Sequence, residues 1–248
     1  KKLFGEAGTA APRVAGLGMS DAAEGFRSLP AVAKELDIIV REEETDDPRG
    51  VLPGRILLNR NFPAAGLSEM LRRGYPIIHI ASHFAFRPGT AADSFMLLGD
   101  GSRLTLLDLE SRRYPFRFID LLTLSACETA VGGEDARGRE IESFAALTQK
   151  RGAGAILATL WPVADVSTGT FMALFYQLRD ARQFNKAEAL REVQLMFLAG
   201  EHDMVPGERD PRGVGPAEEG EGGFEPPPGA PYAHPFYWAP FVLMGNFL

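Results

Sequence analysis

The segment LLTLSACETAVGG, residues 121–133, is an apolar run that ends on Cys127, the only cysteine of the 248 residues, and continues into polar residues and glycines. Its first half has the composition and length of a strand that is buried on both faces. The segment YPIIHIAS, residues 75–82, has the same character and is followed directly by His83. We therefore predict two central strands of a parallel sheet, each with a reactive side chain at its carboxyl end.

Amphipathic segments that predict helices alternate with shorter apolar runs over most of the chain. This alternation predicts an α/β fold with a mostly parallel sheet, right-handed crossovers and helices on both faces. A Gly-Asp-Gly sequence at residues 99–101 predicts a hairpin. Helices are expected within residues 29–42 (followed there by a short strand), 62–74, 138–152, 165–181 and 185–201, and further strands within residues 51–59, 116–126, 153–163 and 234–247.

The predicted domain organisation is one folded unit with two less regular stretches. Residues 1–28 are rich in Ala, Gly and Ser and are expected to be a linker or N-terminal extension of the domain at residues 29–248. Residues 201–233 are rich in Pro, Gly and Glu, which predicts a mobile loop. The first residue is lysine, so we expect the chain to be a piece of a longer polypeptide.

The composition argues against several classes of function. The formal charge is -7 without a long basic run, which disfavours nucleic acid as a partner. No apolar stretch approaches the roughly 18 residues of a membrane helix, so no membrane association is expected. A lone cysteine excludes an internal disulfide and suits a reducing, cytoplasmic compartment. The four histidines have no zinc-ligand spacing, and no metal or cofactor is predicted.

His83 and Cys127 form a candidate catalytic pair. If their strands are neighbours, the strand ends lie about 5 Å apart, and an imidazole beside a thiol helps to generate the reactive thiolate. Taken alone, Cys127 is also explained as a small buried hydrophobic residue. His79 lies in mid-strand and is interpreted as a core histidine.

Five segments in order along the chain resemble a CHAT domain, the caspase- and separase-like cysteine peptidase module often found behind tetratricopeptide repeats. The resemblance extends from about residue 29 to residue 248 and implies a three-layer caspase-like fold. The segments are IIHIASHF, LLTLSACETA, GAILATLWPVADVSTGTFMALFY, KAEALREVQ and HPFYWAPFVLMGNF.

The resemblance implies roles for individual residues. His83 matches the catalytic histidine and Cys127 the nucleophile, with the backbone N–H groups of Phe84 and Cys127 forming the oxyanion hole. Asp165 matches the aspartate that accepts a basic P1 side chain, although an aspartate there also suits a helix N-cap. Glu128 and Trp161 are candidate substrate-binding residues. A solvated turn explains Glu128 equally well, and Trp161 is interpreted as a residue of the core or of the pocket wall.

The resulting expectation is a cysteine endopeptidase that cleaves proteins after Arg or Lys without a cofactor. An upstream repeat region or a partner protein is expected to regulate it, in bacterial-type signalling. Two alternatives stay open: a catalytically silent CHAT module that serves as an interaction scaffold, and a hydrolase or acyltransferase that uses the same pair on a non-peptide bond.

Overall fold

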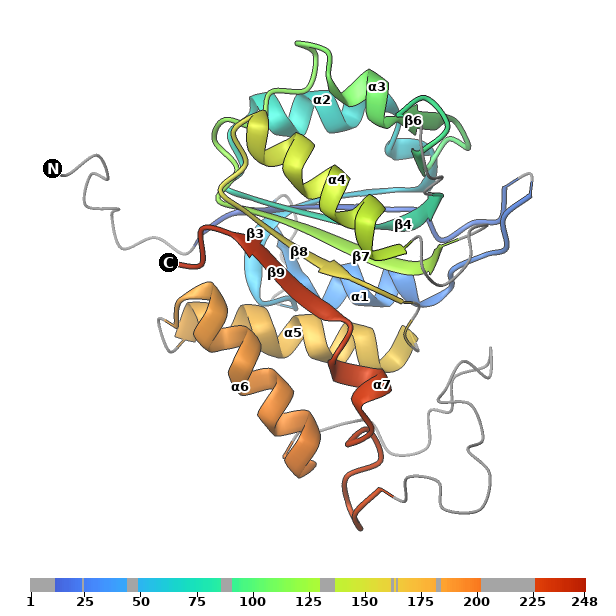
Figure 1. Cartoon of the computed structure of the whole chain (residues 1–248). Coiled ribbons are helices and arrows are strands. Elements are labelled where there is room, and N and C mark those ends of the chain that lie inside the picture. The colour runs from blue at the N-terminus through green and yellow to red at the C-terminus, as the bar shows by residue number, and fades with distance from the viewer. Residues whose placement is uncertain are drawn as a thin grey trace, which may run out of the picture.

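A single sheet with helices on both faces is the centre of the molecule (Figure 1). The computed structural model describes residues 12–23, 25–43, 49–85, 91–129, 137–161, 163, 165–181, 184–201 and 226–248; side chains are described in these ranges except at 126–129, 137–143, 165–166 and 181. The strands are β1 (Val14–Gly18), β2 (Val40–Glu42), β3 (Leu52–Leu58), β4 (Ile77–Ala85), β5 (Phe95–Leu97), β6 (Arg103–Thr105), β7 (Leu121–Thr129), β8 (Ala155–Thr159) and β9 (Phe241–Gly245). The helices are α1 (Ala31–Ile39), the 3-10 turn η1 (Asn59–Asn61), α2 (Ala64–Arg72), α3 (Leu106–Leu109), α4 (Arg137–Lys150), α5 (Asp165–Ala181), α6 (Lys186–Ala199) and α7 (Pro235–Trp238).

The strand order is β2-β3-β1-β4-β7-β8-β9, with the short β5–β6 hairpin attached to β4. The strands from β2 to β8 are parallel along this path, and only β9 at the edge runs antiparallel to its neighbour. The predicted mostly parallel sheet, its hairpin and the three-layer α/β class are therefore confirmed.

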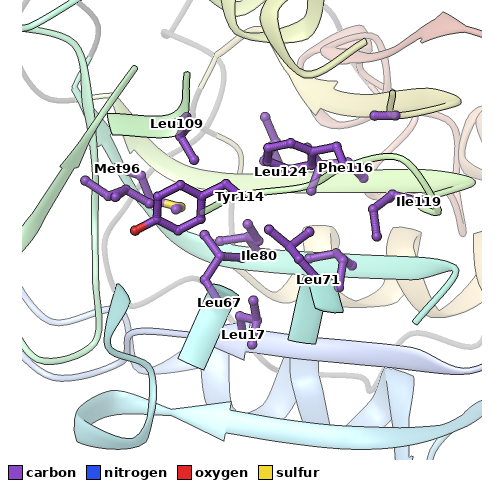
Figure 2. Packing of buried hydrophobic residues seen from close by; sticks show 14 of the residues in the cluster. Leu17, Leu67, Leu71, Ile80, Met96, Leu109, Tyr114, Phe116, Ile119 and Leu124 are labelled. Atoms are coloured by element: carbon purple, nitrogen blue, oxygen red, sulfur yellow. The ribbon is translucent and has the colours of Figure 1, made fainter. Parts of the chain in front are cut away.

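Two helical layers cover the sheet. Helices α2, α3 and α4 lie on one face and α1, α5 and α6 on the other (Figure 1). Every described residue of β4 is buried, as the continuous apolar run predicted. The first core cluster packs Leu67 and Leu71 of α2 against Ile80 of β4 and Leu124 of β7 (Figure 2). Burial on both faces holds β4 and β7 in one register.

The interpretation of residues 1–28 as a linker is wrong for β1, which is a fully buried strand between β3 and β4. Its sequence VAGLG contains two glycines, which lowered its apparent strand character. Glycine is needed here because helix α1 packs very close to the strand. A Cβ on Gly16 would come within 3.1 Å of Leu36, and one on Gly18 within 2.6 Å of Val32.

The C-terminal region differs from expectation in detail. Most of the predicted loop at 201–233 lies outside the described residues, but residues 226–233 form turns in which Ala230 and Ala233 are buried. The end of the predicted loop therefore packs onto the folded domain. The predicted strand at 234–247 is divided into helix α7 and strand β9, because Pro235 begins a short helix.

Candidate active site

The carboxyl ends of β4 and β7 lie side by side, as predicted. The strands pair in parallel up to Ser82 and Ala126, and neighbouring strands are about 4.8 Å apart. His83 and Cys127 are the next residues of the two strands. Their main chains thus meet at the edge of the sheet where ligands of parallel α/β proteins bind.

A bulge interrupts the pairing at this point. The pair that follows is Phe84 with Thr129, so His83 of β4 lies opposite both Cys127 and Glu128 of β7. Bulges are frequent beside active sites, because the extra residue bends the strand and re-aims a side chain. The side chains of Cys127 and Glu128 lie outside the described residues, and their predicted roles are not tested by the structure.

The ring of His83 is fully buried and held from one side by the main chain. Its Nε2 lies 2.9 Å from the carbonyl oxygen of Arg27. A carbonyl can only accept a hydrogen bond, so Nε2 carries the proton and the neutral ring has its lone pair on Nδ1. Nδ1 is therefore the nitrogen of His83 that can act as a base. The ring of Phe26 packs against the imidazole, with 5.0 Å between centroids.

The segment that carries Phe26 and Arg27 is anchored to the ends of two strands. The amide of Met19 donates to the carbonyl of Ala81 on β4. The side-chain oxygen of Asn59, which follows β3, accepts from the amide of Ser20 at 2.7 Å. Asn59 adopts a left-handed conformation, with φ of 51°, that aspartate and asparagine tolerate best. The amide of Leu29 also donates to the carbonyl of Ser20, which closes the loop that carries Arg27.

Sequence reasoning missed Phe26 and Arg27. Arg27 acts through its main-chain carbonyl, which leaves no signal in a sequence. Phe26 is one of the few aromatic residues in the stretch interpreted as a linker, and its aromatic side chain was the available sign that this stretch packs on the domain.

The other histidine of β4, His79, belongs to a buried polar network on the same face of the sheet. Its Nε2 lies 3.0 Å from Glu35 Oε1 of α1, and its Nδ1 lies 3.1 Å from the hydroxyl of Tyr176 of α5. The same hydroxyl lies 2.7 Å from Thr123 Oγ1 of β7. All four residues are buried, and burial raises the pKa of the Tyr176 phenol above its ordinary value. The network ties β4 and β7 to α1 and α5.

Phe84 points to the opposite face of the sheet from His83. Its ring is buried in the cluster with α2 and α4 and forms an edge contact with Phe144, 6.3 Å between centroids. The side chain of Phe84 therefore lies on the other side of the sheet from the ring of His83. An oxyanion role of its backbone N–H remains a prediction.

The remaining predicted residues lie at the same edge of the sheet. Trp161 follows β8, is half-buried, and its indole N–H donates to the carbonyl of Phe236 in α7 at 3.0 Å. This bond supports the interpretation of Trp161 as a wall or core residue. Asp165 is the first residue of α5, and its side chain lies outside the described residues.

This edge of the sheet supplies the elements of acyl transfer by a thiol: an oriented imidazole with a basic Nδ1, and a cysteine on the neighbouring strand. Within the parts of the chain that the structure describes, no three His, Cys, Asp or Glu side chains gather as a metal site. None of the described helices is long and apolar enough to cross a bilayer.

Comparison with protein-family models identifies the family of the chain. The family model described as CHAT domain matches residues 5–246, nearly the whole chain. The matched range includes β1, which agrees with the structure and disagrees with the expectation that residues 1–28 are a linker. The search of curated proteins found no match.

Proposed function

Because the chain belongs to the CHAT family, a family of caspase-like peptidases, we propose that it is a cysteine endopeptidase with His83 and Cys127 as its catalytic pair. The observation that supports this most directly is the bulged pairing of β4 and β7, in which His83 lies opposite Cys127 and Glu128. Among the described residues, His83 is also oriented by a main-chain carbonyl.

In the proposed reaction, the sulfur of Cys127 attacks the carbonyl carbon of the scissile peptide bond, and the thiol proton passes to Nδ1 of His83. The carbonyl π electrons move to oxygen, where the backbone N–H groups of Phe84 and Cys127 stabilise the negative charge. The oxyanion collapses, the C–N bond breaks, and His83 gives its proton to the leaving amine. Water then hydrolyses the thioester, with His83 as base, and regenerates the thiol.

Asp165 is the proposed specificity residue. It stands at the start of α5, beyond the carboxyl edge of the sheet, which is where a substrate would lie. A carboxylate there would form a charge-assisted, bidentate contact with an arginine side chain. We therefore propose cleavage after Arg or Lys.

The burial of His83 supports a regulated enzyme. Its ring has no exposed surface and is packed against Phe26. A substrate reaches such a ring only after residues packed on it, Phe26 among them, move apart, which an upstream repeat region or a partner protein could promote. The same burial favours a second candidate function, a catalytically silent scaffold whose site stays closed.

The test is labelling by peptide chloromethyl ketones that carry Arg, Lys, Asp or Leu at P1, with the modified residue located by mass spectrometry. We expect labelling of Cys127 at least about tenfold faster with Arg or Lys than with the other two reagents, since one charge-assisted contact is worth about 1.5–3 kcal/mol. Asp165→Asn should remove this preference and leave labelling by iodoacetamide unchanged. Equal rates for all four reagents would refute the basic P1 pocket, and no labelling by any reagent would favour the scaffold.

A further inference from the structure

The segment SRRYPFRF, residues 111–118, presents cations and an aromatic ring to solvent. Arg112, Arg113 and Arg117 are exposed, and Phe118 is 70% exposed. Within the described part of the chain, no hydrogen bond or ion pair engages these three guanidinium groups. Aromatic residues and arginine are enriched at protein–protein interfaces, so an exposed phenylalanine among arginines without ion pairs suits such an interface.

The segment is held rigidly, because its alternate residues belong to the core. Tyr114 and Phe116 are buried against α2, β4 and β7 (Figure 2). The hydroxyl of Ser68 on α2 donates to the carbonyl of Arg113 at 2.8 Å. Arg117 packs closely on Gly152, because a Cβ on that glycine would come within 2.7 Å of the Cα of Arg117. A partner would therefore bind a preformed surface and lose little conformational freedom in doing so.

Two neighbouring helices add positive charge. Arg151, just after α4, donates from Nη2 to the carbonyl of Ser111 at 2.6 Å. Arg72, at the end of α2, donates from Nε to the carbonyl of Ser68. Arg72 therefore lies one helical turn from Ser68, the residue whose hydroxyl holds Arg113. We define the basic surface as Arg72, Arg112, Arg113, Arg117, Arg151 and Phe118.

The nearby carboxylates do not neutralise this surface. Glu69 pairs with Arg73 at 2.7 Å, and Asp108 accepts from Thr105 in the capping box of α3. Asp120 pairs with Lys186 at 2.7 Å and with Arg179. Among the described residues of this region, Glu110 remains as an exposed carboxylate.

The basic surface lies at the amino-terminal ends of the parallel strands, whereas His83 lies near the carboxyl-terminal end of β4. Residue 118 precedes β7, and Asp120 donates from its amide to Pro76 just before β4, so the segment lies where the parallel strands begin. Cys127 lies at the other end of β7, roughly 20 Å away at 3.3 Å per residue. A molecule bound to this surface would not cover the candidate active site.

We propose that the basic surface binds an acidic segment of a partner protein, with an apolar side chain of that segment packed on Phe118. The free arginines match carboxylates in charge and in bidentate geometry. A protein is favoured over nucleic acid because the chain as a whole carries a net charge of -7, which repels an extended polyanion. The proposal concerns binding and is independent of proteolysis.

The experiment measures binding of a fluorescein-labelled peptide in which glutamates flank a single leucine, by fluorescence anisotropy at increasing salt. We expect binding that weakens with salt, and a loss of at least about tenfold in affinity in Arg112→Glu/Arg113→Glu. Arg60→Glu/Arg191→Glu is the matched control, because it changes the net charge equally at exposed sites elsewhere. Phe118→Ser should weaken binding several-fold and keep the salt dependence.

Three outcomes would overturn the proposal: no binding at low salt, an equal loss of affinity in the control variant, or stronger binding of single-stranded polythymidine than of the peptide. The last result would assign the surface to nucleic acid. Thermal melting of each variant checks its fold, and substitutions at exposed positions change stability little.

Discussion

The two histidines of β4, His79 and His83, lie on the same face of the sheet and are both fully buried, but different groups hold them. His79 is held through both ring nitrogens by side chains of two helices, Glu35 and Tyr176. His83 is held through Nε2 by the carbonyl of Arg27, at the point where the pairing of β4 and β7 becomes irregular. The difference indicates a division of roles along one strand, with stability determined in the middle and reactivity at the end.

The largest effect is expected in the middle of the strand. Glu35→Ala leaves Nε2 of His79 buried without its partner, which should lower the free energy of unfolding by about 3 kcal/mol. Glu35→Gln keeps an acceptor oxygen and should retain most of the stability. Urea denaturation of the three proteins measures this, and Tyr176→Phe provides an intermediate case, because the lost hydroxyl serves both His79 and Thr123.

The comparison also requires that the network leave the reactivity of Cys127 unchanged. Folded Glu35→Ala should react with iodoacetamide at the wild-type rate. A slowed reaction in this variant, with the protein still folded, would show that the middle of the strand also determines reactivity, and the division of roles would then be wrong.

A smaller effect, on rate rather than on stability, is expected at the end of the strand. His83→Gln keeps a donor for the carbonyl of Arg27 but has no basic nitrogen. We expect labelling of Cys127 by iodoacetamide at pH 7 to fall about tenfold, because a thiol with an ordinary pKa near 8.5 is only a few per cent ionised there. His79→Gln is the matched control and should label normally. Equal labelling in wild type and His83→Gln would contradict the proposed pair.

The same contrast explains how far the sequence predicted the molecule. The apolar runs before His83 and Cys127 predicted buried neighbouring strands, because burial on both faces leaves a continuous hydrophobic signal. The bulge opposite His83 was not predicted, because register depends on pairing between distant segments. Strand β1 was missed because its glycines reflect contact with α1, which is a tertiary feature.

The smallest effect is expected for an exposed pair at the other edge of the sheet. Arg13, just before β1, donates two hydrogen bonds to Glu43, and these hold the pKa of the Glu43 carboxyl below its ordinary value of 4.5. The pair resembles Glu35 and His79 in joining an acid to a base, but its side chains are 46% and 35% exposed. Exposure screens the charges, so Glu43→Gln should lower the free energy of unfolding by less than about 1 kcal/mol at neutral pH.

The pH dependence of the Glu43 contribution has a definite sign. A carboxyl whose pKa is lowered by folding stabilises the protein above its ordinary pKa of 4.5 and loses this contribution as the pH falls and it is protonated. The difference in stability between wild type and Glu43→Gln, measured by urea denaturation, should therefore be greatest near neutral pH and vanish in acid. A difference as large as that of Glu35→Ala would show that burial is not what separates the two pairs, and a difference that grows in acid would reverse the assigned direction of the shift.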